Sequence, residues 1–314
     1  MSGQEIIVAL QNQLGNLISP ITSVAGTVIT LIFLRKKTSV EISTQEFEKI
    51  KAGKLGEVAD ELLKNGQLTY TEYYKMGNFL EIAKRADKVN SNKSPLENVP
   101  QQDLDWHIRF FDDCGYVSNE YMQEIWARLL AGEVRNPGSY SLRTIQCLKN
   151  MSQKEALLFK KICDCSYDSV RHVILPNNDS FLDKKGIKYE DILTLGECGL
   201  VNSDPNITET IKMNVGKEYS IIGIRKDQVL VVKTKANDGR IKNDLTIPEY
   251  LFTQIGKEIY TVVTAEGLNL TELLALYSNN YKDYEFFITN VVRRDGERVI
   301  YRNPHSAIDQ RSDI

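Results

Sequence analysis

The sequence predicts a mainly α-helical protein with a smaller α+β part toward its C-terminal end. Three observations support this class. Apolar residues recur at helical spacing through the first half of the chain. A polar, proline-containing stretch interrupts them at residues 89–102. β-branched runs and turn residues begin after residue 189. We therefore expect an N-terminal hydrophobic helix, a helical core, a winged-helix-like segment and a terminal β-hairpin.

Composition sets limits on function. The chain has 314 residues, a net charge of −3 and 42% hydrophobic residues, which is ordinary globular composition with room for two or three domains. The near-neutral charge argues against a dedicated duplex-DNA binder, because such proteins carry a basic surface. Five cysteines occur without a secretory signal, so we expect reduced thiols in a part that faces the cytosol.

The N-terminal stretch from Ile6 to Leu34 contains no charged side chain and ends at Arg35-Lys36-Lys37. It is long enough to span a bilayer, and its Ser, Thr, Gly and Pro residues suit a helix that packs against copies of itself. The basic cluster would then stay cytoplasmic. The membrane-facing residues that we expect are Leu17, Ile21, Val24, Val28, Leu31 and Phe33. The alternative is a buried core or oligomerisation helix.

Helical patterns continue after the basic cluster. A predicted helix from Leu68 to Ala86 carries Tyr70, Tyr73 and Tyr74. These tyrosines could stack bases, with Lys75, Lys84 and Arg85 beside phosphates; a tyrosine-rich packing face is the preferred interpretation. The expected domains are residues 1–37 (hydrophobic helix), 38–88 (helical connector), 89–102 (linker), 103–165 (helical core), 166–303 (winged-helix-like α+β domain) and 304–314 (flexible tail).

The stretch from Trp106 to Met151 holds the strongest helical signal. Met122, Ile125, Trp126, Leu129 and Leu130 follow an amphipathic spacing. Ser118 is the expected N-cap of this helix, and Gly132 its expected end. Ser139 or Ser141 is expected to cap the next helix. Further on, the sequence predicts strands at 219–224 and 228–234, and a hairpin around Asp295-Gly296.

No catalytic, metal or cofactor site is predicted, and an enzyme is not expected. P-loop, dinucleotide and nucleophile-elbow motifs are missing from the sequence. Cys163-x-Cys165 with His172 could suggest zinc, but no second ligand pair follows, and packed thiols are preferred. Asp112-Asp113 is interpreted as a solvated face or a helix end, because adjacent helical residues diverge.

Two groups of basic residues suggest phosphate binding. Arg135 and Arg143 flank a turn with hydroxyls, backbone N–H groups and a helix N-terminus, and Tyr140 could provide a stacking surface. A structural turn, in which an arginine holds a carboxylate such as Glu133, is the competing interpretation. Arg293, Arg298 and Arg302 form the second group, on the C-terminal hairpin. There the alternative is an edge strand protected by charge.

The run RFF (109–111), WARLLAGEV (126–134) and PGSYSLRT (137–144) resembles a bacterial domain family of unknown function. The layout, a hydrophobic leader on a body without catalytic motifs, also resembles the membrane effectors of the Hailong anti-phage defence systems. That resemblance implies a channel-forming effector of abortive infection in the bacterial inner membrane, with its body cytoplasmic. It further implies a homo-oligomer, with a tetramer as the first guess. A companion nucleotidyltransferase would make a single-stranded oligodeoxyadenylate that keeps the effector inactive.

The alternative function is a soluble oligomeric scaffold or a nucleic-acid-binding regulatory module with a buried N-terminal helix. Cell fractionation separates the two, because the soluble module stays in the supernatant without detergent. An enzyme whose site is assembled from distant residues is a third hypothesis that no residue spacing supports.

Overall fold

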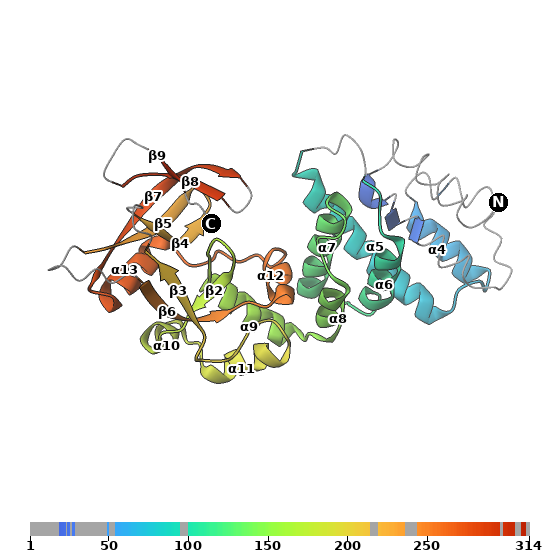
Figure 1. Cartoon of the computed structure of the whole chain (residues 1–314). Coiled ribbons are helices and arrows are strands. Elements are labelled where there is room, and N and C mark those ends of the chain that lie inside the picture. Colours follow the sequence, from blue (N-terminus) through green and yellow to red (C-terminus); the bar gives the residue numbers. More distant parts are fainter. Residues whose placement is uncertain are drawn as a thin grey trace. The chain divides into compact units, whose positions relative to one another are not determined.

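The computed structural model describes residues 19–22, 24–25, 27–28, 49, 54–94, 100–213, 219–235, 244–295 and 298–304, together with the backbone of 309–311. The chain forms two compact units, Met1–Gln153 and Lys154–Ile314 (Figure 1). The sequence instead placed boundaries at a linker over 89–102 and at residue 165. Helix α5 extends to Ser91, so it occupies the first residues of that linker.

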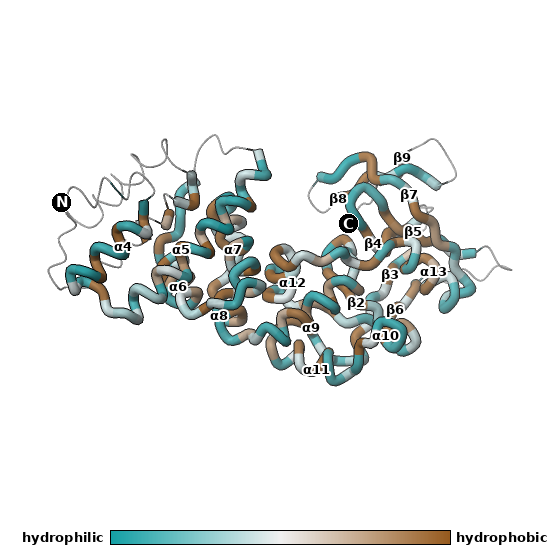
Figure 2. The backbone as a smooth tube through the Cα atoms, turned by 180° about the vertical axis from the view of Figure 1, so that it is seen from behind, coloured by the Kyte–Doolittle hydropathy of each residue, from teal (hydrophilic) through white to brown (hydrophobic). Residues whose placement is uncertain are grey.

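The first unit is helical. Its long helices within the described ranges are α4 (Leu55–Lys64), α5 (Tyr70–Ser91), α6 (Leu104–Cys114), α7 (Glu120–Arg135) and α8 (Leu142–Asn150). Helix α5 packs along α7 and also contacts α4 and α6. Apolar and polar residues alternate along these helices, as amphipathic helices around a common core require (Figure 2).

Aromatic residues form the centre of this helical core. The ring of Phe110 stacks on that of Trp106 at 5.2 Å and meets the edge of Trp126 at 5.1 Å. Phe79 of α5 packs against Phe111 at 4.9 Å. Trp126 and Phe110 are fully buried, so the run that carried the family resemblance is the core of this unit.

Two expected helix ends differ from the structure. Asn119, not Ser118, caps α7, because its side-chain oxygen accepts the N–H of Met122 at 3.1 Å. Helix α7 also continues through Gly132 to Arg135. Gly132 is needed for packing rather than termination, since a Cβ there would lie 2.6 Å from the hydroxyl of Tyr140. Ser141 caps α8, as one of the two expected serines.

The second unit is α+β. Its elements are α9 (Gln153–Asp164), β1 (Tyr167–Asp168), β2 (Val173–Pro176), α10 (Asp179–Lys185), α11 (Tyr189–Glu197), β3 (Thr208–Lys212), β4 (Ser220–Arg225), β5 (Gln228–Thr234), β6 (Asp244–Leu251), α12 (Gln254–Tyr260), α13 (Leu270–Asn280), β7 (Tyr284–Asp295), β8 (Arg298–Arg302) and β9 (Asp309–Arg311). The predicted strands and the β7–β8 hairpin are present, while the turn residue Gly296 lies outside the described residues.

One antiparallel sheet joins the described strands in the order β3-β6-β2-β1-β4-β5-β7-β8-β9. The sheet curls so that edge strand β3 comes close to β4, where the Ser220 hydroxyl donates to the carbonyl of Lys212 at 3.1 Å. One cluster of its core consists of Tyr219, Ile224, Val229, Val231, Val299 and Tyr301. The α+β prediction is confirmed, but the sheet is far larger than a wing and a hairpin.

Candidate functional site

The described part of the N-terminal segment is helical after Ser19 and turns several side chains inward. Ile21, Val24 and Val28 are 0%, 7% and 1% exposed, and Thr27 is buried beside them. Of the other predicted membrane residues, Leu17, Leu31 and Phe33 lie outside the described residues. None of the helices in the described part of the chain has both the length and the apolar character that crossing a membrane requires.

Hydroxyl groups fasten this segment to helix α5. The hydroxyls of Ser19 and Thr22 both donate to the carboxylate of Asp87, with 3.0 Å between Thr22 Oγ1 and Asp87 Oδ2. Ser19 also accepts the N–H of Thr22 at 3.1 Å, and Pro20 occupies the first helical position, so the sequence starts a helix there. The polar residues that make this segment a poor lipid span are therefore the ones that hold it to the protein.

The predicted phosphate-binding turn is already occupied by a side chain of the protein. The carboxylate of Glu133 accepts the backbone N–H groups of Gly138 at 2.6 Å and Tyr140 at 3.0 Å. Glu133 is buried, and this burial raises its pKa, while the backbone hydrogen bonds act in the opposite direction. The N–H groups that we assigned to phosphate thus bind Glu133, and the turn is structural.

The other residues predicted around this turn do not converge. The guanidinium of Arg135 donates to the carbonyl of Ser94 at 2.9 Å rather than to Glu133. Tyr140 is buried against Gly132, and its carbonyl accepts the indole N–H of Trp106 at 2.8 Å. It therefore offers no open ring face for a base. Arg143 is exposed on α8.

The arginines of the C-terminal hairpin lie on its solvent side. Arg298 and Arg302 are exposed on β8, whereas Val299 and Tyr301 between them are buried in the core. Arg293 is paired with Ile300 across the hairpin and lies 3.5 Å from Asp295. This side alternation confirms the one predicted for the strand. Arg135 and Arg143 belong to the other unit.

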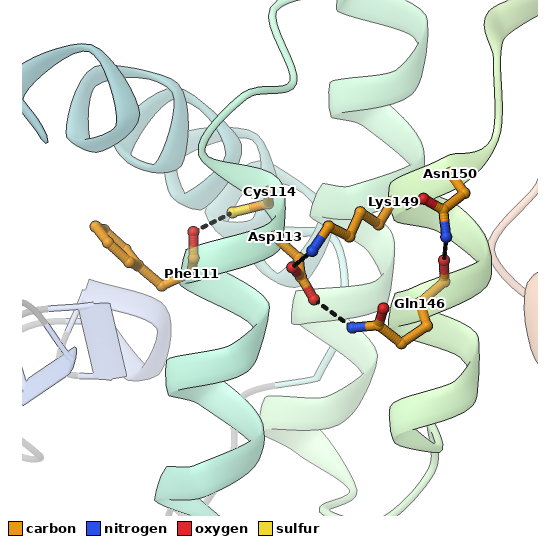
Figure 3. A network of polar contacts seen from close by, with 6 residues as sticks. All are labelled: Phe111, Asp113, Cys114, Gln146, Lys149 and Asn150. Carbon is orange, nitrogen blue, oxygen red and sulfur yellow. Dashed lines mark hydrogen bonds and ion pairs between the residues drawn. The ribbon is translucent and has the colours of Figure 1, made fainter. Parts of the chain in front are cut away.

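The acidic pair lies at the end of α6, as one of the two interpretations expected, with Asp112 exposed and Asp113 turned inward. Asp113 is buried, and its carboxylate contacts the Lys149 ammonium at 2.6 Å and the Gln146 amide at 2.8 Å (Figure 3). These contacts tie α6 to α8. The neighbouring thiol of Cys114 donates to the carbonyl of Phe111 at 3.7 Å, and its burial raises its pKa. We interpret the network as structural, because Asp113 uses both carboxylate oxygens to join α6 to α8.

Metal and acid–base candidates are equally confined to packing roles. Cys163 and Cys165 are buried free thiols whose pKa values burial raises. Within the described ranges, no group of three or more metal-ligating side chains gathers. His107 is buried, its Nε2–H donates to the side-chain oxygen of Gln102 at 2.9 Å, and burial lowers its pKa to about 4. It is therefore neutral at pH 7.

Three features were missed or undervalued in the sequence. Asp87 belongs to an ordinary charged run, and nothing in its neighbours indicates a contact 65 residues away. Tyr70, Tyr74 and Tyr116 lie on the surface of the helical unit instead of packing. The sequence gives no sign that Glu249 differs from an ordinary exposed strand residue, yet it is fully buried beside Tyr167. Only the three-dimensional pairing of elements reveals these positions.

Comparison with known proteins places the chain in a family. The chain has two units, a helical core and a curled antiparallel sheet. It belongs to the family described as "Protein of unknown function (DUF2806)", whose model matches residues 71–270. This match covers nearly two thirds of the chain and begins after the N-terminal segment. No curated protein and no solved structure matches the chain.

Proposed function

We propose that this protein is a membrane-active effector of bacterial anti-phage defence whose helical unit shelters an apolar N-terminal segment. The observation that carries the proposal is the docking of that segment: its apolar residues Ile21, Val24 and Val28 are buried, and Asp87 binds its hydroxyls. Burial removes the apolar surface from water, whereas release would expose it and favour lipid. The basic cluster Arg35-Lys36-Lys37 would remain on the cytoplasmic side.

A ligand controls such an effector only if it binds the docked and released states with different affinities. We propose a single-stranded oligonucleotide, made by a companion nucleotidyltransferase, that favours the docked state and is removed during infection. Released segments from several chains, with a tetramer as the first guess, would then disrupt or cross the inner membrane. The exposed arginines Arg293, Arg298 and Arg302 offer one of the candidate surfaces for this anionic ligand, on the second unit.

The central test removes the Asp87 carboxylate. Asp87→Ala leaves the hydroxyls of Ser19 and Thr22 without their acceptor, so the released state gains population. We expect more protein in the detergent-extracted membrane fraction and greater toxicity on expression. Lys88→Ala is the matched control, because Lys88 is exposed on the next position of the same helix. Deleting residues 6–34 should abolish both effects while the body keeps its circular dichroism spectrum.

The proposal fails if the toxicity survives the deletion, or if Asp87→Ala and the wild type stay entirely in the high-speed supernatant. Depolarisation of the cells, followed with a potential-sensitive dye, separates membrane damage from other causes of growth arrest.

A soluble nucleic-acid-binding module is the second candidate. Helices α9, α10 and α11, followed by pairing of β6 with both β2 and β3, give the order of a winged-helix module with β4 and β5 inserted. Gly186 in the left-handed region ends α10 three residues before α11. However, α11 carries Glu190, Asp191 and Glu197 and has no basic residue, which is unfavourable beside duplex phosphates. Complete recovery in the supernatant would favour this candidate.

A further inference from the structure

Three tyrosines of the helical unit expose their rings. The exposed fractions of Tyr70, Tyr74 and Tyr116 are 83%, 48% and 60%. Large aromatic side chains are normally placed in a core or an interface, because burying each ring is strongly favourable. The preferred sequence interpretation, a packing face, therefore does not hold for Tyr70 and Tyr74. They point away from the core that Met76 and Phe79 of the same helix enter.

The three rings belong to one surface, the tyrosine surface (Tyr70, Tyr74 and Tyr116). Tyr70 and Tyr74 are four residues apart on α5 and so share a helical face. The loop after α6 is fixed to α5, since the Asn78 amide donates to the carbonyl of Gly115 at 2.7 Å. Tyr74 is held beside this loop by hydrogen bonds with Asn78 and Ser118, which lower its pKa.

A cation completes the surface. The ammonium of Lys75 lies 4.4 Å from the centre of the Tyr116 ring. Gly115 permits this approach, because a Cβ at that position would lie 2.8 Å from the Lys75 Cβ. Exposed rings beside the Lys75 ammonium combine the two groups that nucleotides need, a flat face for a base and a charge for a phosphate.

We propose that Tyr70, Tyr74 and Tyr116, with Lys75, form a base-stacking site for single-stranded nucleic acid. This inference names a ligand surface for the proposed function and rests on that function for its biological role. It replaces Tyr140, which is buried, as the stacking residue. In this site the exposed rings supply most of the affinity through stacking, and Lys75 adds one contact to a phosphate.

Helix α5 gives this site a route to the N-terminal segment. Tyr74 and Asp87 are carried by the same uninterrupted helix, about 20 Å apart at 1.5 Å per residue. Bases stacked near the start of α5 and hydroxyls bound near its end would therefore both contact the same helix.

Binding is tested with the purified full-length protein in detergent, by fluorescence anisotropy with labelled dA12 and dT12. Base–aromatic stacking is worth about 1–3 kcal/mol per base, so each Tyr→Ala change should weaken binding about 5- to 150-fold. Tyr→Phe at the same positions keeps the ring and should restore most of the affinity. With one phosphate-binding cation, the affinity should fall with salt at a logarithmic slope no steeper than about −1.

Tyr189→Ala is the matched control. The exposed fraction of Tyr189, 46%, is similar to that of Tyr74, but Tyr189 lies on α11 of the other unit. It should bind like the wild type, and circular dichroism should show that every variant is folded. The inference is overturned if the wild type binds neither oligonucleotide, if the triple alanine variant binds unchanged, or if Phe fails to restore binding. An affinity that falls much more steeply with salt would contradict this site and would indicate binding to the hairpin arginines instead. Membrane fractionation is independent of these readouts, so either proposal can fail alone.

Discussion

Glu249 is the residue whose environment is furthest from that of an ordinary side chain. It is fully buried on β6, where it accepts the Tyr167 hydroxyl at 2.8 Å, and that hydroxyl lies 2.9 Å from the Tyr277 hydroxyl. Burial, and next the nearby carboxylate of Glu209, raise the pKa of Glu249 to about 8. Tyr281, the residue after α13, also lies near the group, and Arg171 acts on Glu209 from the β1–β2 loop. Glu249 is therefore protonated at neutral pH.

This arrangement predicts a loss of stability with rising pH. The folded-state pKa lies above the unfolded value, so the stabilisation is complete below the unfolded pKa of 4.5 and is lost as pH rises toward about 8. Each pH unit in that window costs at most about 1.4 kcal/mol. Glu249→Gln keeps an acceptor for Tyr167 and cannot ionise, so its unfolding free energy should vary less between pH 5 and pH 9. Urea denaturation at each pH gives the comparison, and parallel curves for both proteins would contradict the assignment.

At the same scale, the turn after α7 shows what sequence could and could not provide. The composition of that turn suggested either a phosphate on its backbone N–H groups or an arginine that holds Glu133, and in the structure the N–H groups of Gly138 and Tyr140 hold Glu133 themselves. The composition could not indicate this pairing, because it depends on α7 continuing through Gly132. Gly132 suggested a helix end in the sequence. In the structure it lies inside α7, and the ring of Tyr140 packed against it explains why the position needs a glycine.

Among the elements, helices α7 and α5 each contain a glycine, and the two glycines have opposite predicted effects. Gly132→Ala puts a Cβ 2.6 Å from the Tyr140 hydroxyl, so it should destabilise the protein by about 1–3 kcal/mol through overpacking. Gly77→Ala on α5 meets nothing within 4 Å and should stabilise it by about 0.5–1 kcal/mol through helix propensity. Chemical denaturation of both variants measures these changes, and a stabilised Gly132→Ala would refute the packing role.

Element type was predictable where one pattern dominated. The amphipathic spacing of α7, the β-branched run of β5 and the alternation of β8 all gave elements with the expected buried sides. The extent of the sheet was not predictable, because β1 and β2 are short strands whose partners β4 and β6 lie more than 50 residues away in the chain. The docking of Ser19 on Asp87 is equally non-local, so no window of sequence contains both partners.

For the whole molecule, the separate cores of the two units predict independent unfolding. Aromatic packing around Phe110 stabilises the first unit, and a different cluster around Val229 and Tyr301 stabilises the second. Both tryptophans of the chain, Trp106 and Trp126, lie buried in the first unit. Tryptophan fluorescence therefore reports only the first unit, whereas far-ultraviolet circular dichroism reports both.

Urea denaturation followed by the two signals should accordingly give curves that do not coincide, since two-state behaviour fails when domains unfold separately. A fragment of residues 152–314 retains α9, whose Phe159 packs on Phe252 at 5.4 Å, and should reproduce the transition that fluorescence does not detect. Coincident curves in the full chain, together with an unfolded fragment, would show that the second unit depends on the first. In that case a ligand bound to one unit would stabilise both, and control of the N-terminal segment would not need a site on α5.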